Sequence, residues 1–417
     1  MPVVVAHADD GRRIDSQSQN SRNPFYRGRR LITIITSDDV KLGDHPKHVY
    51  IHIPFCYHKC GYCDFASLAG VDHLADRYLT ALDREISTSV ERRSVSTIFV
   101  GGGTPTRLSA IQLERLLDVI RRAFDLASGG EFTVEANPGT LDREKVEVLA
   151  AGGVNRISLG AQSFQKSSLK VLERDHEPDE VIRAVEWIAP RFPRWSIDLI
   201  FGVPGSTLSM WTDDLDRTLA LGPSHLSCYG LVYEKGTPLW KSRREGLVSE
   251  LNEDLERAMY ETTIDRLAEA GLEMYEISNY ARQGHESLHN LAYWANASYY
   301  GFGVGAARYV NGVRSVNTRD IMAYLNRIEA GGDATGPSET LDAESRARET
   351  AVLMLRRIKL GIDRAEFALR TGFDLDRLVG SKFEKHRRNR LVDDDGLRVR
   401  LTREGIFLAD TVLADIV

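Results

Sequence analysis

The sequence predicts an α/β protein, in which a partial barrel of the (β/α)6 type is followed by helices and by a C-terminal module that resembles a winged helix. Short apolar runs alternate with longer amphipathic segments from residue 47 to about residue 235. Strands that are joined by helices run parallel, because a tight turn cannot connect parallel neighbours. The polar side chains of such a fold gather at the carboxyl ends of its strands, where we expect the chemistry.

Six apolar runs predict the parallel strands, at residues 48–52, 97–100, 132–136, 156–159, 196–200 and 226–231. Apolar residues at three- and four-residue spacing predict helices at residues 74–90, 110–124, 143–151 and 208–220. Beyond the barrel we expect a helix at 251–270 and a stretch rich in glycine and aromatic residues at 275–312. The last part, 363–417, predicts two helices, a hairpin that turns at Asp395 and Gly396, and a final helix.

This pattern divides the chain into four parts: a flexible extension (1–44), the barrel core (45–235), a helical and glycine-rich extension (236–335) and the C-terminal module (336–417). The first part is polar and rich in arginine and has no sustained periodicity. A transit peptide is not favoured there, because such peptides contain few acidic residues and this segment contains Asp9, Asp10 and Asp15.

Composition excludes several classes of protein. Of 417 residues, 42% are hydrophobic and 27% charged, which excludes general disorder. The net charge of -6 argues against a protein that mainly binds nucleic acid. A basic run in the tail is followed by three aspartates and predicts a solvated face: Lys382, Lys385, His386, Arg387, Arg388 and Arg390. No apolar stretch approaches the roughly 20 residues of a membrane span, so we expect a cytoplasmic protein.

Three of the four cysteines lie within eight residues, in the pattern C-x3-C-x2-C formed by Cys56, Cys60 and Cys63. Thiolates select zinc or iron–sulfur clusters. Zinc would need a fourth ligand, for which His52 or His58 is available, although the spacing is unusual for a zinc site. Three cysteines on a cubane cluster leave one iron open to a cofactor or substrate.

Other polar positions follow the predicted strands. Three successive glycines, Gly101 to Gly103, precede Thr104 and either form a tight turn or let a ligand approach the backbone. The carboxylate of Glu135 could accept hydrogen bonds from ribose hydroxyls at the end of the third strand. Asp198 lies among apolar residues of the fifth strand, where an acid is not expected for packing. Cys228 stands alone, and we interpret it as a small buried apolar residue.

The block from Tyr50 through Cys63 to Phe65 resembles the radical S-adenosylmethionine (SAM) signature of the oxygen-independent coproporphyrinogen III oxidase-like family, and within it the heme chaperone branch, HemW. The resemblance runs over most of residues 47–415. It implies a radical SAM barrel in which the three cysteines bind a [4Fe-4S] cluster, whose fourth iron is chelated by the amino and carboxylate groups of SAM. It assigns cofactor contacts to Tyr50, Phe65, Gly102, Gly103, Thr104, Glu135, Gln162, Arg174, Asp198 and Gly230. We place Arg174 on the helix that follows the fourth strand.

Two positions favour the chaperone branch over the dehydrogenase branch. The dehydrogenases carry a further cysteine two residues after the third cluster cysteine, where this chain has Phe65. The segment His289-Asn290-Leu-Ala-Tyr293-Trp294 reproduces the HNxxYW motif of the chaperones and is assigned by resemblance to heme binding. Imidazole is a common axial ligand of heme iron, and aromatic rings offer flat surfaces to the macrocycle. Without the resemblance, the same pattern also suits a loop-capping histidine beside core aromatic residues.

The resemblance therefore implies a heme chaperone that binds a [4Fe-4S] cluster, SAM and heme and delivers heme to apo-hemoproteins, including membrane-associated respiratory proteins, with a homodimer as a further expectation. The main alternative is an oxygen-independent coproporphyrinogen III oxidase, which makes protoporphyrinogen IX by oxidative decarboxylation. A radical SAM methyltransferase or cyclase is a second alternative. Phe65 argues against the first and the HNxxYW motif against the second. Nucleic acid is not expected as a partner.

Overall fold

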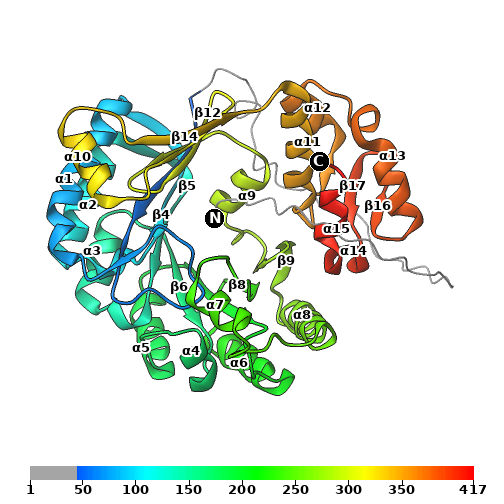
Figure 1. The fold of residues 1–417 in the computed structure, drawn as a ribbon, viewed down its shortest axis with the longest axis horizontal. Helices are drawn as coiled ribbons and strands as arrows, with labels where there is room; N and C mark the ends of the chain where they lie inside the picture. The colour runs from blue at the N-terminus through cyan, green and yellow to red at the C-terminus, as the bar shows by residue number, and fades with distance from the viewer. Residues whose placement is uncertain (1–44) are drawn as a thin grey trace.

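A twelve-stranded sheet organises residues 45–417, the part of the chain that the computed structural model describes. The expected flexible extension, residues 1–44, lies outside the described residues. Six neighbouring strands of the sheet run parallel, as predicted: β1 (His48–Ile53), β4 (Arg93–Gly102), β5 (Phe124–Ala136), β6 (Arg156–Gln162), β7 (Arg194–Phe201) and β8 (His225–Gly230). Helices cover one face of this curved sheet, and the C-terminal module lies across its open side (Figure 1).

Further strands extend the sheet at both edges and come from residues 273–340, for which the sequence predicted no strands. One edge gains β11 (Tyr299–Phe302), which pairs parallel with β1, and then the antiparallel strands β12 (Ala307–Val310), β13 (Val313–Asn317) and β14 (Thr335–Thr340). The other edge gains β10 (Asn279–Ala281) and β9 (Glu273–Glu276). Most of these strands have only three to five residues, too few to produce a periodic signal. The edge strands β14 and β9 do not pair with each other, so the barrel is open.

The crossover helices agree closely with the predicted ones: α1 (Ala75–Ser89), α2 (Ala110–Ala123), α3 (Arg143–Ala151) and α6 (Leu208–Leu221). A capping box of Ser109 and Gln112 starts α2, and left-handed Gly222 ends α6. Two further helices, α4 (Lys166–Val171) and α5 (Pro178–Ile188), follow β6. The helical placement of Arg174 was wrong, because the left-handed residue Glu173 interrupts the chain after α4 and α5 begins only at Pro178.

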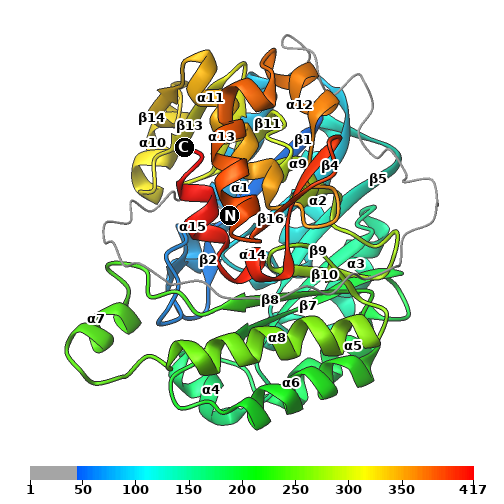
Figure 2. The same ribbon diagram turned by 90° about the vertical axis from the view of Figure 1, so that its right-hand side faces the viewer.

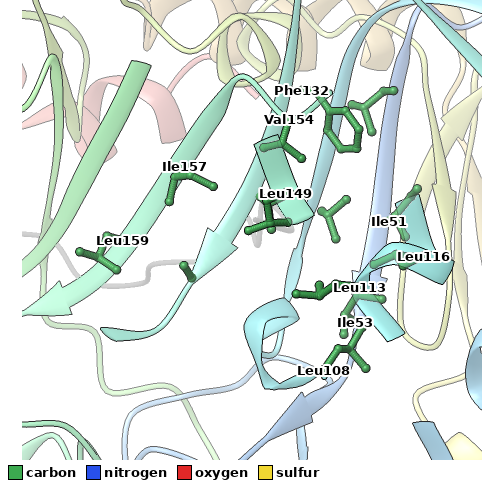
Figure 3. Close-up of a cluster of buried hydrophobic side chains, with 14 of the residues drawn as sticks. Ile51, Ile53, Leu108, Leu113, Leu116, Phe132, Leu149, Val154, Ile157 and Leu159 are labelled. Carbon is green, nitrogen blue, oxygen red and sulfur yellow. The ribbon is translucent and has the colours of Figure 1, made fainter. Parts of the chain in front are cut away.

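The helix-covered face of the sheet forms the main hydrophobic core. Figure 3 shows Ile51, Ile53, Phe132, Ile157 and Leu159 on the strands, packed against leucines of α2 and α3. Each such side chain contributes about 1.5–3 kcal/mol on burial. Cys228 belongs to the same core and is 1% exposed, as its apolar interpretation predicted. Because side chains of a strand alternate between faces, the residues between these apolar ones line the opposite, inner face.

The C-terminal module has its own apolar core and contains α11 (Ala343–Leu355), β15 (Ile362–Asp363), α12 (Arg364–Thr371), α13 (Leu375–Arg388), β16 (Val392–Asp394), β17 (Arg398–Leu401), α14 (Arg403–Phe407) and α15 (Ala409–Ala414). Its hairpin turns at Asp395 and left-handed Gly396, as predicted. Most of the basic run lies on α13, where Lys382 and Lys385 both form ion pairs with Asp415 of the same module. Figure 2 shows this module in front of the sheet, with α8 (Glu253–Glu269) below it. None of the helices in residues 45–417 is long and apolar enough to cross a membrane.

Candidate functional site

The three clustered cysteines lie in one loop at the carboxyl end of β1. Cys56 ends the two-residue strand β2 (Phe55–Cys56), and a turn follows in which the Cys63 amide donates to the Cys60 carbonyl at 3.1 Å. Gly61, within this loop, donates to Leu172 at 3.3 Å and accepts from Leu239 at 2.8 Å. These backbone bonds attach the cysteine loop to the segments that follow β6 and β8.

Each cysteine sulfur has a polar neighbour. Thr104 Oγ1 lies 3.6 Å from Cys56 Sγ, and the hydroxyl of Ser67 lies 3.7 Å from Cys63 Sγ. Arg174 donates from Nη1 to Cys60 Sγ at 3.4 Å. Burial raises the pKa of Cys56 to about 11, and a coordinated metal overcomes such a shift because it deprotonates its thiol ligands.

The donor set fits an iron–sulfur cluster better than zinc. His52 uses both ring nitrogens elsewhere, with the Tyr50 hydroxyl at 2.9 Å and the Ala66 carbonyl at 3.1 Å. The His58 ring bonds Glu173 at 3.2 Å. Within residues 45–417, no three histidine, cysteine or acidic side chains converge on one metal ion. In a cubane cluster each thiolate binds a different iron, so three spaced thiolates suit that group.

The glycine loop crosses closely over β1, which explains why these positions lack side chains. Gly102 has a φ of 108°, and a Cβ there would lie 2.2 Å from the His52 ring. A Cβ at Gly103 would lie 2.7 Å from the Ile53 carbonyl oxygen. The Gly102 amide donates to Glu135 Oε2 at 2.9 Å. The structure therefore joins two predicted contacts, Glu135 and the glycine loop, by a hydrogen bond.

Burial raises the pKa of Glu135 to about 7, and the nearby Asp198 carboxylate adds to this rise. Asp198 is half-buried and accepts from the Ser158 hydroxyl at 2.9 Å. The two carboxylates lie on the inner face, on β5 and β7, with β6 between them. They provide hydrogen-bond acceptors for a ligand with hydroxyl or amino groups.

Gln162 and Arg174 converge at Gly160, on the strand between those carboxylates. Arg174 Nη2 donates to the Gly160 carbonyl at 2.7 Å, and a Cβ at Gly160 would lie 2.9 Å from Gln162 Nε2. Gln162 has a φ of 65°, a left-handed conformation that is uncommon outside glycine. Gly230 ends β8 and Phe65 is 40% exposed on the cysteine loop, so both lie at the rim of the carboxyl-terminal end.

The HNxxYW segment forms α9 (Leu288–Trp294), and its histidine is buried against the inner face. His289 Nδ1 lies 2.7 Å from Thr97 Oγ1, and its ring stacks on Phe99 with 5.2 Å between centroids. The Tyr293 ring meets it edge-on at 4.6 Å. Burial, together with His48, lowers the pKa of His289 well below its usual range, so the imidazole is neutral. Its Nε2 is buried and has no hydrogen-bond partner among the described residues, and an unpartnered nitrogen of a neutral imidazole is the kind that can ligate a metal.

Glu131 fixes the start of α9 on the sheet. Its buried carboxylate accepts from the Ser287 hydroxyl at 3.2 Å and from the Leu288 and His289 amides at 3.0 and 3.2 Å. A carboxylate at a helix N-terminus also interacts favourably with the helix dipole. Sequence reasoning missed Glu131 and Thr97. The signal for both was the alternation of polar and apolar residues in β4 and β5.

The four residues of the HNxxYW motif do not all face the same part of the structure. His289 and Tyr293 share one side of α9, whereas Asn290 and Trp294, four residues apart, share another. The guanidinium of Arg356, at the end of α11 in the C-terminal module, lies over the Trp294 ring, 4.6 Å from its centroid. Trp294 is thus directed at that module.

The histidine and the cysteine loop lie at opposite ends of the inner face. Thr97 lies four residues before Gly101 on β4, which corresponds to roughly 13 Å along a strand. The rings of Tyr50 and Phe99 stack between the two ends at 6.3 Å. Contrary to the expectation for barrel folds, the heme-motif histidine is not at the carboxyl ends of the strands.

Comparisons with known proteins show the family and the fold of this chain. Residues 50–218 match the radical SAM superfamily, and residues 341–408 match the HemN C-terminal domain. The chain is 36% identical to the heme chaperone HemW of Bacillus subtilis, over 88% of this chain and 98% of that protein. It is 39% identical to the HemW of Lactococcus lactis, over 88% and 96%. The coproporphyrinogen III oxidase HemN of Escherichia coli, a radical SAM enzyme, has the same fold, with a TM-score of 0.79 over 91% of this chain and 92% of that one, at 22% identity.

Proposed function

This chain belongs to the heme chaperone HemW family of the radical SAM superfamily, and from this membership we propose that it binds a [4Fe-4S] cluster, SAM and heme and transfers the heme to apo-hemoproteins. The main observation in support of heme binding is the neutral, buried imidazole of His289, whose Nε2 has no hydrogen-bond partner among residues 45–417. A neutral imidazole nitrogen is the form that binds heme iron. Phe99 and Tyr293 supply aromatic surface beside it.

The cofactor part of the proposal rests on the cysteine loop and the inner face next to it. Cys56, Cys60 and Cys63 would hold the cluster, and a cluster with one open iron supplies a coordination site for the amino and carboxylate groups of SAM. Glu135 and Asp198 offer carboxylate oxygens to its hydroxyl groups. Glu135 Oε2 is occupied by the Gly102 amide, while Oε1 has no hydrogen bond within the described part of the chain.

The remaining proposals concern what the protein acts on. We propose apo-hemoproteins, including membrane-associated respiratory ones, as recipients, the cytoplasm as its location and a homodimer as its assembly. Decarboxylation of coproporphyrinogen III is not part of the proposal, because Phe65 stands where the dehydrogenase branch has a cysteine.

The test is a heme titration of the anaerobically reconstituted protein, followed by absorbance. Saturable binding is expected for wild type, together with a clear loss of affinity in His289→Ala. His386→Ala is the matched control, since that histidine is also buried but bonds Asp415 in the C-terminal module. Wild-type protein that binds no heme would overturn the proposal. A parallel incubation with coproporphyrinogen III, SAM and a reductant should yield no protoporphyrinogen IX.

A further inference from the structure

Two arginines lie side by side on the inner face at the start of neighbouring strands. Arg156 on β6 and Arg194 on β7 are partners in the parallel register. The residues that follow them, Ile157 and Trp195, belong to the hydrophobic core on the other face, so the two arginines point inward. Arg156 is 2% exposed. Like charges in register on neighbouring strands disfavour the fold unless something compensates them.

Within residues 45–417 no carboxylate forms an ion pair with either arginine, and the Arg156 charge only offsets part of the rise that burial gives to the pKa of Asp198. The hydrogen bond of Arg156 is from Nη1 to the His285 carbonyl at 3.3 Å, and no acidic oxygen lies within 4 Å of either guanidinium. The acids nearby have other hydrogen-bond partners: Glu131 binds the start of α9, and Asp198 binds Ser158. A buried charge without an ion-pair partner is costly, so this position favours an anionic ligand.

A second buried group, on β8 and two strands from β6, points to the same conclusion. His225 is 1% exposed, its Nε2 lies 2.9 Å from the Tyr275 hydroxyl, and its Nδ1 has no partner among the described residues. Burial, and after it the positive charge of Arg156, lowers the pKa of His225 well below its usual range. A neutral imidazole can donate one hydrogen bond from Nδ1, which an anion would accept.

The arginine pair lies next to the heme-motif histidine. Residues 285–289 cross the inner face and form one hydrogen bond to each of three neighbouring strands. The His285 carbonyl accepts from Arg156 on β6, and the Ser287 hydroxyl donates to Glu131 on β5. The His289 ring shares a hydrogen bond with Thr97 on β4. Arg156 is on β6, which is therefore two strands, or roughly 10 Å, from β4, where Thr97 bonds His289. A ligand that spans this distance could contact both Arg156 and His289.

We propose that Arg156 and Arg194, with His225 beside them, bind the propionate carboxylates of the heme whose iron faces His289. This inference rests on the proposed heme binding and specifies which groups recognise the ligand. A guanidinium matches a carboxylate with two parallel hydrogen bonds, and two propionates balance two guanidinium charges. The site would thus select porphyrins by their acidic edge, independently of the iron ligand.

The test compares iron protoporphyrin IX with its dimethyl ester, which has the same ring and iron but no carboxylates. Both are titrated into reconstituted wild type, Arg156→Gln, Arg194→Gln and His289→Ala. We expect wild type to prefer the free acid by about 10- to 100-fold, the range for hydrogen bonds to charged groups. Either arginine variant should lose most of this preference while its affinity for the ester stays near that of wild type. His289→Ala should weaken both ligands.

Controls separate recognition from folding. Arg191→Gln removes an exposed arginine that pairs with Glu147 and should keep the full preference. Arg194→Gln without heme should be no less stable to urea than wild type, since it removes a like charge from beside Arg156. Equal binding of acid and ester by wild type, or equal loss of both in the arginine variants, would overturn the propionate site alone. Absence of saturable binding of either porphyrin would overturn the proposed function and this inference with it.

Discussion

The hydroxyl oxygen of Thr97 lies 2.7 Å from Nδ1 of His289, and the same oxygen lies 2.9 Å from Nδ1 of His48. A hydroxyl has one hydrogen, so Thr97 donates to one imidazole and accepts from the other. If His289 donates from Nδ1, its Nε2 has the free electron pair that a metal requires. Thr97 then donates to His48, which burial holds neutral by lowering its pKa to about 4. Thr97 is therefore a positioning residue for His289.

Thr97→Val should weaken heme binding by about 10- to 100-fold, the usual effect of removing the group that orients a metal-binding histidine. The measurement is the absorbance titration described above. Thr218→Val is the matched control, because Thr218 is equally buried and bonds only the Asp214 carbonyl within its own helix. Identical heme affinity in wild type and Thr97→Val would contradict the positioning role.

Glu131→Gln should destabilise the protein by about 1–3 kcal/mol, because an amide replaces one carboxylate oxygen that faces the hydroxyl and amide donors at the start of α9. Urea unfolding measures this difference. Glu144→Gln removes an exposed acid from the first turn of α3 and should change stability by less than about 0.5 kcal/mol. A loss in Glu131→Gln no greater than in this control would show that the carboxylate does not hold the helix.

Gly102→Ala should abolish SAM binding and lower stability by about 1–3 kcal/mol, since the new Cβ would overlap the His52 ring. Gly129→Ala provides the control: Gly129 also has a positive φ, of 78°, but a Cβ there meets nothing within 4 Å. Both substitutions strain the backbone, but only Gly102→Ala also brings a Cβ into overlap with the His52 ring. Binding of SAM, measured by calorimetry, should survive in Gly129→Ala.

Ionisation of Glu135 should make the cofactor-free protein less stable as pH rises. The folded-state pKa is raised from 4.5 to about 7, so the folded protein binds more protons than the unfolded chain between those values, and its stability falls across that interval. At 1.36 kcal/mol per pKa unit the loss is roughly 3 kcal/mol. Urea unfolding should show that the free energy of unfolding of wild type is lower at pH 8 than at pH 4.5. In Glu135→Gln this decrease should be smaller by roughly 3 kcal/mol. An equal fall in both proteins would refute the assignment.

Cys56→Ala should remove the visible absorbance that iron–sulfur charge transfer gives to the reconstituted protein, and lower its iron content. Cys228→Ala should keep both, because that sulfur is buried in the apolar core on the opposite face of the sheet. An intact cluster in Cys56→Ala would disprove the ligand assignment.

The sequence by itself determined the parallel strands, most of their helices and the cysteine loop. Apolar periodicity sets which face of a strand or helix is buried, and residues that act together in one short loop, such as Cys56, Cys60 and Cys63, are close in space because they are close in the chain. The same holds for the hairpin at Gly396, where a left-handed residue is needed between two short strands.

Only the tertiary structure decided what faces the inner side of the sheet. The contacts of Thr97 and Glu131 with the segment around His289 join residues more than 150 positions apart, and no local pattern specifies such pairs. The short edge strands and the loop position of Arg174 were also set by neighbours distant in sequence. The unpaired charges of Arg156 and Arg194 became evident only when the parallel register placed them side by side, because charge compensation depends on distance in space.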